Sequence, residues 1–184
     1  MKRRIFVAID LPTDLKAEVS KLIQQWRWLP IRWLKPEHWH ITVLPPVSLE
    51  DEEVAALSEL LRLARLGGPF PIVFSNIVLA PPGGPARMVW LEGETPKSLP
   101  ELRERIGAVW KSDRRLSPFR PETRALSLHV TLARFEPGDL AELEVKTKIL
   151  GAVKLRFEAA DIAVMESRLL PNGAEYQTLA TAAL

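Results

Sequence analysis

The sequence predicts a mixed α+β protein that forms one domain of 184 residues. Short apolar runs rich in branched side chains, typical of strands, are interspersed with stretches whose apolar residues recur at helical spacing. The expected order is strand, helix, strand, helix, two strands, helix, strand, helix, strands. This order lacks the strict alternation of a parallel doubly wound sheet. No linker is long enough to separate independent domains, so we expect one domain, residues 1–184, with two lobes at most.

The chain opens with a strand and a helix. Residues 4–10 are short, apolar and rich in branched side chains, which is typical of a buried strand. Thr13 or Asp14 can cap the helix that follows, and Pro30 ends it. The apolar side of this helix is formed by residues at helical spacing, namely Leu15, Val19, Leu22, Ile23 and Trp26.

Prolines divide the next segment. Residues 32–44 contain two strand-like pieces separated by a proline, and we expect the second piece to stop at Pro45. Residues 48–66 predict a second helix because their apolar side chains recur at helical spacing. Ser48 precedes Asp51 by three residues, which indicates a weak capping box.

The second half of the chain adds more strands than helices. Residues 96–110 predict a third helix and residues 137–150 a short fourth one, whereas the polar stretch 111–125 predicts a loop. A turn is expected at Pro171–Gly173. The expected strands of this half are residues 70–79, 86–91, 126–135, 153–160, 162–168 and 175–182.

Composition excludes several classes of protein. The chain has no cysteine, which excludes disulfides, thiolate zinc sites and a cysteine nucleophile. Neither a signal-peptide pattern nor a run of about 18 apolar residues is visible, so we expect a cytoplasmic protein without membrane contact. The formal net charge of +2 permits a phosphate-bearing ligand without requiring one.

One short motif occurs twice. His40-Ile41-Thr42-Val43 and His129-Val130-Thr131-Leu132 share the form His–apolar–Thr–apolar, about half a chain length apart. Both copies, at 40–43 and 129–132, lie in expected strands, where residues two apart point to the same face. Each histidine therefore shares a face with its threonine. If the two halves are related by an approximate two-fold axis, the two pairs can face each other across a cleft.

Such a pair of motifs suits the chemistry of phosphodiesters. An imidazole has an ordinary pKa of about 6.5, so two of them can divide the roles of proton donor and proton acceptor. Threonine hydroxyls can donate hydrogen bonds to phosphoryl oxygens, where charge concentrates in the transition state. This chemistry requires no metal or other cofactor, and the sequence suggests no complete set of metal ligands.

The two motifs resemble the paired HxTx signatures of the 2H phosphoesterase superfamily. The flanking sequences narrow the resemblance to its RNA 2′,3′-cyclic phosphodiesterase family, of the LigT and ThpR type. The likeness covers nearly the whole chain. The segments that carry it are RIFVAIDLP at 4–12, residues 32–43, RMVWL at 87–91, LHVTLAR at 128–134, and Glu166-Ser167 through Gly173 and Tyr176.

The resemblance implies a bilobal α+β fold: two pseudo-symmetric lobes, each with an antiparallel sheet and outer helices, around a central cleft. It implies hydrolysis of RNA 2′,3′-cyclic phosphate ends to 2′-phosphate ends by a monomer, without a cofactor. By resemblance, His40 is the proton donor and His129 the proton acceptor, while Thr42, Thr131 and Arg134 bind the phosphate.

The substrate-binding assignments have structural alternatives, and for Thr42 and Thr131 the alternative is that threonine simply favours strands. Arg134 lies five positions after His129, an odd offset that directs it to the other face of a regular strand unless a bulge intervenes. It then forms a surface ion pair instead. Phe6 is predicted to stack on a base of the substrate, and packing in the core is the alternative.

Other features permit further interpretations. His38 forms His-x-His with His40, a spacing that some metal sites use, although an exposed position, or one just behind the reacting groups, fits it better. The tryptophans can stack on bases or form core. The arginines of the loop at 111–125 can follow an RNA backbone or simply be solvated: Arg114, Arg115, Arg120 and Arg124.

Two functional alternatives remain open. An RNA-end binding module would use the same cleft without turnover, although binding alone does not require two titrating groups. A ligase-like reaction that forms 2′,5′ linkages would use the same catalytic pair. A product assay distinguishes all three hypotheses.

Overall fold

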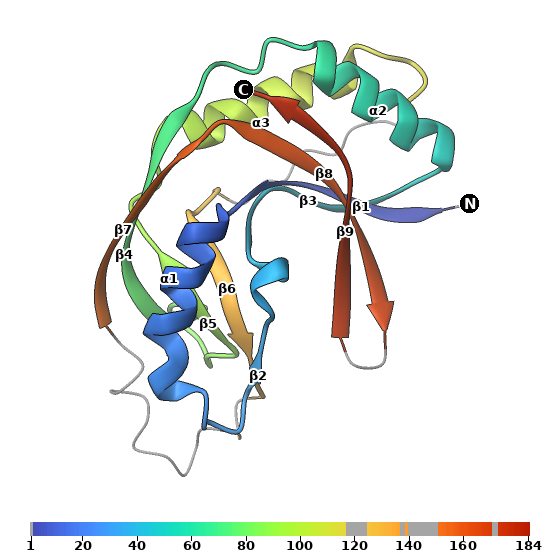
Figure 1. The fold of residues 1–184 in the computed structure, drawn as a ribbon. Helices are drawn as coiled ribbons and strands as arrows, with labels where there is room; N and C mark the ends of the chain where they lie inside the picture. The colour runs from blue at the N-terminus through green and yellow to red at the C-terminus, as the bar shows by residue number, and fades with distance from the viewer. Residues whose placement is uncertain (1, 117–124, 137–138, 140–150, 171–172) are drawn as a thin grey trace.

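The computed structural model of this chain describes residues 2–116, 125–136, 139, 151–170 and 173–184. Its strands form two antiparallel sheets (Figure 1). The first sheet has the order β3-β1-β8-β9. These strands are β1 (Arg3–Asp10), β3 (His40–Leu49), β8 (Asp161–Leu170) and β9 (Gly173–Ala183). The first sheet thus combines strands from both halves of the sequence.

The second sheet has the order β2-β6-β5-β4-β7. Its strands are β2 (Arg32–Trp33), β4 (Phe70–Ala80), β5 (Met88–Glu92), β6 (His129–Arg134) and β7 (Gly151–Ala159). A strand–helix–strand unit occurs once in each sheet: β1 and β3 are neighbours in the first, β5 and β6 in the second. The fold therefore contains an internal repeat, and each copy carries one His–x–Thr motif.

Each helix of the repeat covers the sheet to which its own strands do not belong. Helix α1 (Thr13–Ile23) follows β1 of the first sheet and contacts β7 of the second. Helix α3 (Ser98–Lys111) follows β5 of the second sheet and contacts β3 and helix α2 (Asp51–Leu63). Figure 1 shows α1 beside the sheet of β4 and β7, and α2 with α3 over the other sheet. This exchange joins the two lobes.

Strand β3 is longer than the sequence predicts. We expected it to stop at Pro45, but it runs through Pro45 and Pro46 to Leu49. Strand β3 lies at the edge of the first sheet, so no strand pairs with its outer side. Proline is tolerated there because no neighbouring strand needs a hydrogen bond from its missing amide hydrogen. The expectation of a break at these prolines was wrong.

Helix boundaries also differ from those expected. The first helix ends at Ile23 and continues only as the 3-10 turn η1 (Gln24–Trp26), short of Pro30. Helix α2 begins at Asp51, and its capping box is formed by Glu50 and Glu53, so the box predicted at Ser48 was wrong. The short helix predicted at 137–150 lies almost wholly outside the described residues, as do Pro171 and Asn172 of the predicted turn.

The core lies between the sheets and the helices that cover them. Its largest fully buried side chains come from both halves of the repeat, and they include Trp39, Phe74, Ile5, Ile41 and Leu91. A smaller apolar group, Phe6, Ala8, Ala163 and Met165, packs on the other face of the first sheet with Tyr176 against it. Strand β1 is thus buried on both faces, as its continuous apolar run predicts.

Within the described part of the chain, no helix has the length and apolar character needed to cross a bilayer.

Candidate active site

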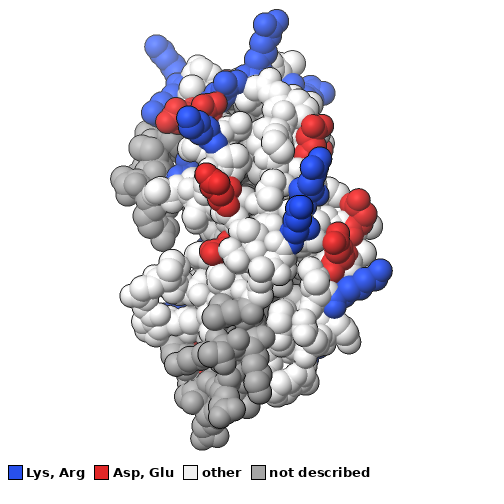
Figure 2. Space-filling model, turned by 90° about the vertical axis from the view of Figure 1, so that its left-hand side faces the viewer, with Lys and Arg blue, Asp and Glu red and all other residues white. Residues whose placement is uncertain are grey.

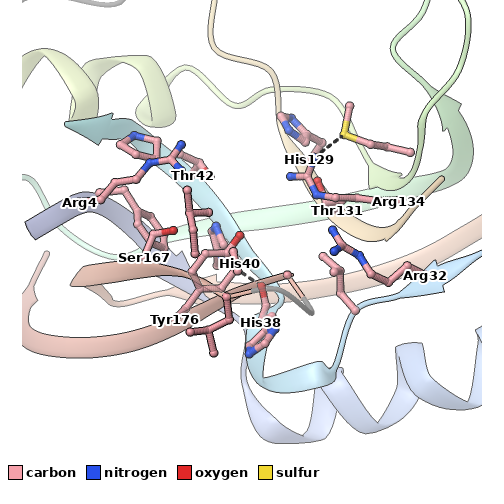
Figure 3. Close-up of a pocket in the computed structure, with 18 of the residues that line it drawn as sticks. Arg4, Arg32, His38, His40, Thr42, His129, Thr131, Arg134, Ser167 and Tyr176 are labelled. Atoms are coloured by element: carbon pink, nitrogen blue, oxygen red, sulfur yellow. Dashed lines mark hydrogen bonds between the residues drawn. The ribbon is translucent and has the colours of Figure 1, made fainter. Parts of the chain in front are cut away.

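A cleft of about 730 Å³ is lined by residues of both sheets (Figure 3). The first sheet contributes side chains of β1, β3, β8 and β9, and the second contributes those of β2, β5 and β6. Both motif histidines and both motif threonines line it. The structure therefore brings together residues that are about half a chain length apart in sequence.

Strand alternation directs the motif side chains into this cleft. In β3, Ile41 and Val43 are fully buried in the core, while His40 and Thr42 on the opposite face are partly exposed. The same pattern recurs in β6, where Val130 is fully buried and His129 and Thr131 are partly exposed. The period of two in the sequence predicts this placement.

Arg134 lies on the same face as His129 because β6 contains a bulge. Val89 of β5 pairs with Ala133, but the next residue, Trp90, pairs with Thr131, so Leu132 is an extra residue. Leu132 and Ala133 are both fully buried, and the alternation is shifted by one. Arg134 consequently lines the cleft, with a guanidinium nitrogen 3.5 Å from the sulfur of Met88.

The bulge itself is repeated. In β3, Leu44 pairs with Val7 and Thr42 pairs with Ala8, which leaves Val43 as the extra residue. Each motif threonine is thus followed by two consecutive buried residues in both halves. The position equivalent to Arg134 is occupied by Pro45, so only the second half supplies a cation there.

Both imidazoles are held in the same way by the backbone. The Nδ1 atom of His40 lies 2.8 Å from the carbonyl oxygen of His38, and that of His129 lies 3.0 Å from the carbonyl oxygen of Ser127. A carbonyl only accepts hydrogen bonds, so each Nδ1 carries a proton and donates it. The Nε2 atom of each ring remains for proton transfer in the cleft.

Two aromatic rings fix the position of His40. The centroid of its ring lies 4.9 Å from that of Phe6 and 5.1 Å from that of Tyr176, which is also 5.2 Å from the ring of Phe6. Phe6 lines the cleft, but only 3% of it is exposed. These contacts place Phe6 against the histidine.

His129 has an aromatic neighbour of its own. The Trp90 ring stacks on its imidazole at a centroid distance of 3.9 Å and an interplanar angle of 22°. Trp90 lies opposite Thr131 in the neighbouring strand β5 and also lines the cleft. The sequence alone does not distinguish Trp90 from the other tryptophans, because its stacking on His129 depends on the register between strands.

Burial lowers the pKa of both histidines. Desolvation lowers the pKa of His40 to about 4, although the His38 carbonyl and the charge of Asp10 oppose this shift. Desolvation also lowers the pKa of His129, and the nearby charge of Arg134 adds to the shift, while the Ser127 carbonyl opposes it. Both rings are therefore neutral at pH 7 in the empty cleft.

The charged side chains that line the cleft are of one sign. Arg4, Arg32 and Arg134 line it, and none of its described lining residues is Asp or Glu. None of the three forms an ion pair with a described carboxylate. By contrast, on the face that carries β7, basic and acidic side chains are interspersed among the coloured residues of Figure 2. The cleft is thus suited to an anion.

Two of these arginines were not predicted as site residues. Arg4 shares a strand face with Phe6, two residues away, so strand periodicity could have identified it. Arg32 lies in the two-residue strand β2, directly opposite Arg134 of β6. A strand this short gives no periodic signal in the sequence. Ser167 of β8 and Tyr176 of β9, which pair with each other, also line the cleft.

The other candidate residues lie as follows. The His38 ring packs against Tyr176 at 5.2 Å, and among the described residues no group of three or more His, Cys, Asp or Glu is placed to hold a metal ion. Arg115 pairs with Asp113 and Glu59 on the surface. Arg120 and Arg124 of the predicted arginine-rich loop lie outside the described residues.

Comparison with known proteins agrees with this geometry. The profile of the family described as LigT like Phosphoesterase matches residues 9–90. A protein of Methanocaldococcus jannaschii named RNA 2′,3′-cyclic phosphodiesterase is 29% identical over 181 residues, which cover 96% of this chain and 98% of the relative.

Solved structures confirm the predicted fold. A crystal structure of a Thermus thermophilus protein has a TM-score of 0.79 and 23% identity, and the match covers 98% of this chain and 97% of that one. Escherichia coli LigT, crystallised with 3′-AMP, has a TM-score of 0.77 and 20% identity, covering 100% of this chain and 99% of its own. The bilobal α+β architecture expected from the sequence is therefore correct.

Proposed function

We propose that this chain is a LigT-like phosphoesterase that hydrolyses 2′,3′-cyclic phosphate ends of RNA to 2′-phosphate ends. The observation that carries the proposal is the convergence of two imidazoles, one from each sheet, on a cleft whose described lining contains no carboxylate. Each imidazole has its Nδ1 atom engaged by a carbonyl, which leaves Nε2 for chemistry.

The proposed reaction is a single displacement at phosphorus. Nε2 of His129 accepts a proton from a water molecule, whose oxygen attacks the phosphorus atom. The bond from phosphorus to O3′ breaks, and Nε2 of His40 donates a proton to the departing O3′. The phosphate stays on O2′. The direction of these roles follows the family resemblance, since the two histidines are held alike.

Charge on the phosphate is balanced by donors on the same cleft wall. Thr42 and Thr131 each lie two residues after a motif histidine, on its face of the strand. Their hydroxyls donate to the non-bridging oxygens, and the guanidinium of Arg134 binds the charge that increases in the transition state. The bulge in β6 supports this role for Arg134, because it directs the side chain into the cleft.

We expect His40 to become protonated when the substrate binds. The pKa of about 4 leaves His40 neutral in the empty cleft at pH 7. An anionic phosphate beside the ring favours the charged imidazolium and raises this pKa on binding. The donor therefore becomes charged where it is needed.

The test is turnover of a 2′,3′-cyclic nucleotide by the wild-type protein and two variants. His40→Gln and His129→Gln should each lower kcat by about 10²–10⁴-fold, because each removes one partner in proton transfer. Chromatography of the product should find the phosphate on O2′. Turnover should persist in EDTA, since the proposed steps require no metal.

A control variant is Glu158→Gln. This exposed side chain of β7 lines neither the cleft nor the hollow beside it, so turnover should stay close to that of the wild type. Circular dichroism should show all three variants folded. A wild-type rate in either catalytic variant would contradict the mechanism. Tight binding of the nucleotide without any product would favour an RNA-end binding module, and a 2′,5′-linked product would favour a ligase.

A further inference from the structure

A second hollow of about 320 Å³ adjoins the cleft at one end. The two share the lining residues Arg32, Leu34, His38, Leu170, Gly173 and Ala174, so they form one continuous depression. The second hollow adds Trp33, Lys35 and Glu175. A cyclic phosphate held between the two histidines would not fill this additional space.

Arg32 stands at the junction of the two hollows. Its Cα is paired with that of Arg134 across strands β2 and β6. Like charges directly opposite each other in a sheet are destabilising unless an anion offsets them. Neither arginine forms an ion pair with a carboxylate in the described part of the chain. The pair thus provides two adjacent cations that no described carboxylate neutralises.

Glycine at position 173 fixes where the guanidinium of Arg32 lies. A Cβ on Gly173 would be 2.7 Å from Nη1 and 3.3 Å from Cζ of Arg32, so the guanidinium lies directly on the glycine backbone. The φ of Gly173 is +123°, which other residues rarely adopt. Arg32 therefore reaches from the second sheet to the start of β9 in the first, and Figure 3 shows it beside Arg134 at this end of the cleft.

The rest of the hollow is suited to a sugar and a base. Leu170 is 46% exposed and lines the hollow, so it offers apolar surface to a ligand. Trp33 and Leu34 add apolar surface. Lys35 brings a further cation, His38 brings an imidazole whose pKa is lowered by burial, and Glu175 is the one carboxylate in the described lining.

We propose, building on the function proposed above, that this second hollow binds the ribonucleotide that precedes the cyclic phosphate end. Arg32 holds the phosphodiester that joins this nucleotide to the terminal one, and the apolar residues contact its ribose or base. The cleft then receives the cyclic phosphate itself. The enzyme is consequently selective for the ends of RNA chains over free cyclic mononucleotides.

The experiment compares kcat/KM for uridine 2′,3′-cyclic phosphate with kcat/KM for a dinucleotide that ends in the same group. The wild type should prefer the dinucleotide. Arg32→Ala should lower the ratio of dinucleotide to mononucleotide kcat/KM by about tenfold or more, since a charge-assisted hydrogen bond is lost. The loss should appear in KM. The KM of Arg32→Ala for the dinucleotide should also depend less on salt concentration than that of the wild type, because one contact between opposite charges is lost.

Two further variants make the result specific. Gly173→Ala should lower the same ratio, because the added methyl group displaces the guanidinium of Arg32. Arg156→Ala, in β7 and exposed, removes an equal charge from a residue that does not line the cleft, and it should leave both substrates unaffected. Thermal unfolding should confirm that each variant is folded.

The outcomes separate this inference from the function on which it rests. Equal kcat/KM of the wild type for both substrates, or an equal loss for both in Arg32→Ala, would overturn the second subsite while leaving the phosphodiesterase in place. Absence of turnover with either substrate would overturn both proposals.

Discussion

A backbone carbonyl and neighbouring aromatic rings orient each imidazole of the cleft. His40 is held by the His38 carbonyl and packs on Phe6, while His129 is held by the Ser127 carbonyl and stacks on Trp90. In both cases the side chain is desolvated enough to lower its pKa. The activity of the pair therefore depends on residues that take no part in proton transfer.

The lowered pKa values have a consequence for the pH profile. The proposed mechanism needs one charged and one neutral imidazole in the free enzyme, and both pKa values lie below the ordinary 6.5. Above both values the two rings are neutral. Hence kcat/KM should fall as pH rises above 6.5, by about tenfold per unit. A kcat/KM that stays constant between pH 6.5 and 8 would contradict a proton donor with a lowered pKa.

Trp90 should affect catalysis through His129. Trp90→Leu removes the stacked ring, and kcat should fall by up to about tenfold, in line with an aromatic pair worth about 0.5–1.5 kcal/mol. Trp90→Phe keeps a ring and should restore much of the rate. The pH profile of kcat/KM should also shift in Trp90→Leu, because the surroundings of the imidazole change. An unchanged rate and profile would limit Trp90 to packing.

The sequence predicts which face of a strand each site residue occupies only where the strand is regular. Period two correctly places His40 with Thr42 and His129 with Thr131. It fails at Arg134, because a bulge depends on pairing with β5 and has no local signature in β6. The stacking of Trp90 and the position of Arg32 depend on register between strands, which no single segment encodes.

Strands and helices show that position in a sheet outweighs local propensity. Two prolines predicted the end of β3, yet as an edge strand it continues for three residues beyond them. By contrast, β1 and helix α3 follow their apolar patterns closely, since both bury the surface that the pattern marks. Elements with strong periodicity were predictable, and those shaped by neighbouring strands were not.

Strand β5 should be sensitive to one small substitution at its end. A Cβ at Gly93 would overlap the carbonyl oxygen of Val73 in β4 and come within 3.1 Å of the Cα of Phe74. Gly93→Ala should therefore destabilise the protein by about 1–3 kcal/mol, the usual cost of overpacking. Urea denaturation measures this change. Gly84→Ala, in an exposed loop with open space around it, is the matched control and should be near neutral. Equal stability of the two variants would contradict the close packing of β4 on β5.

The whole molecule is held together by elements that cross between its halves. Helix α1 contacts the sheet opposite to its own strand β1, and α3 does the same in the other direction. Arg103 of α3 also donates a hydrogen bond of 3.0 Å to the carbonyl of Val43 in β3. The two rows of motif side chains are therefore fixed relative to each other by a shared core.

Because strands from both halves of the sequence form each sheet, cutting the polypeptide near its middle does not separate the two lobes. A cut between Gly83 and Gly84, in an exposed turn, would leave both sheets assembled from strands of both pieces, and would assign His40 to one piece and His129 to the other. Neither fragment should hydrolyse a cyclic nucleotide by itself, whereas mixing the two should restore activity through complementation. Turnover by one fragment alone would refute this view of the architecture. The same property would make the protein a split reporter, whose signal depends on two separate chains meeting.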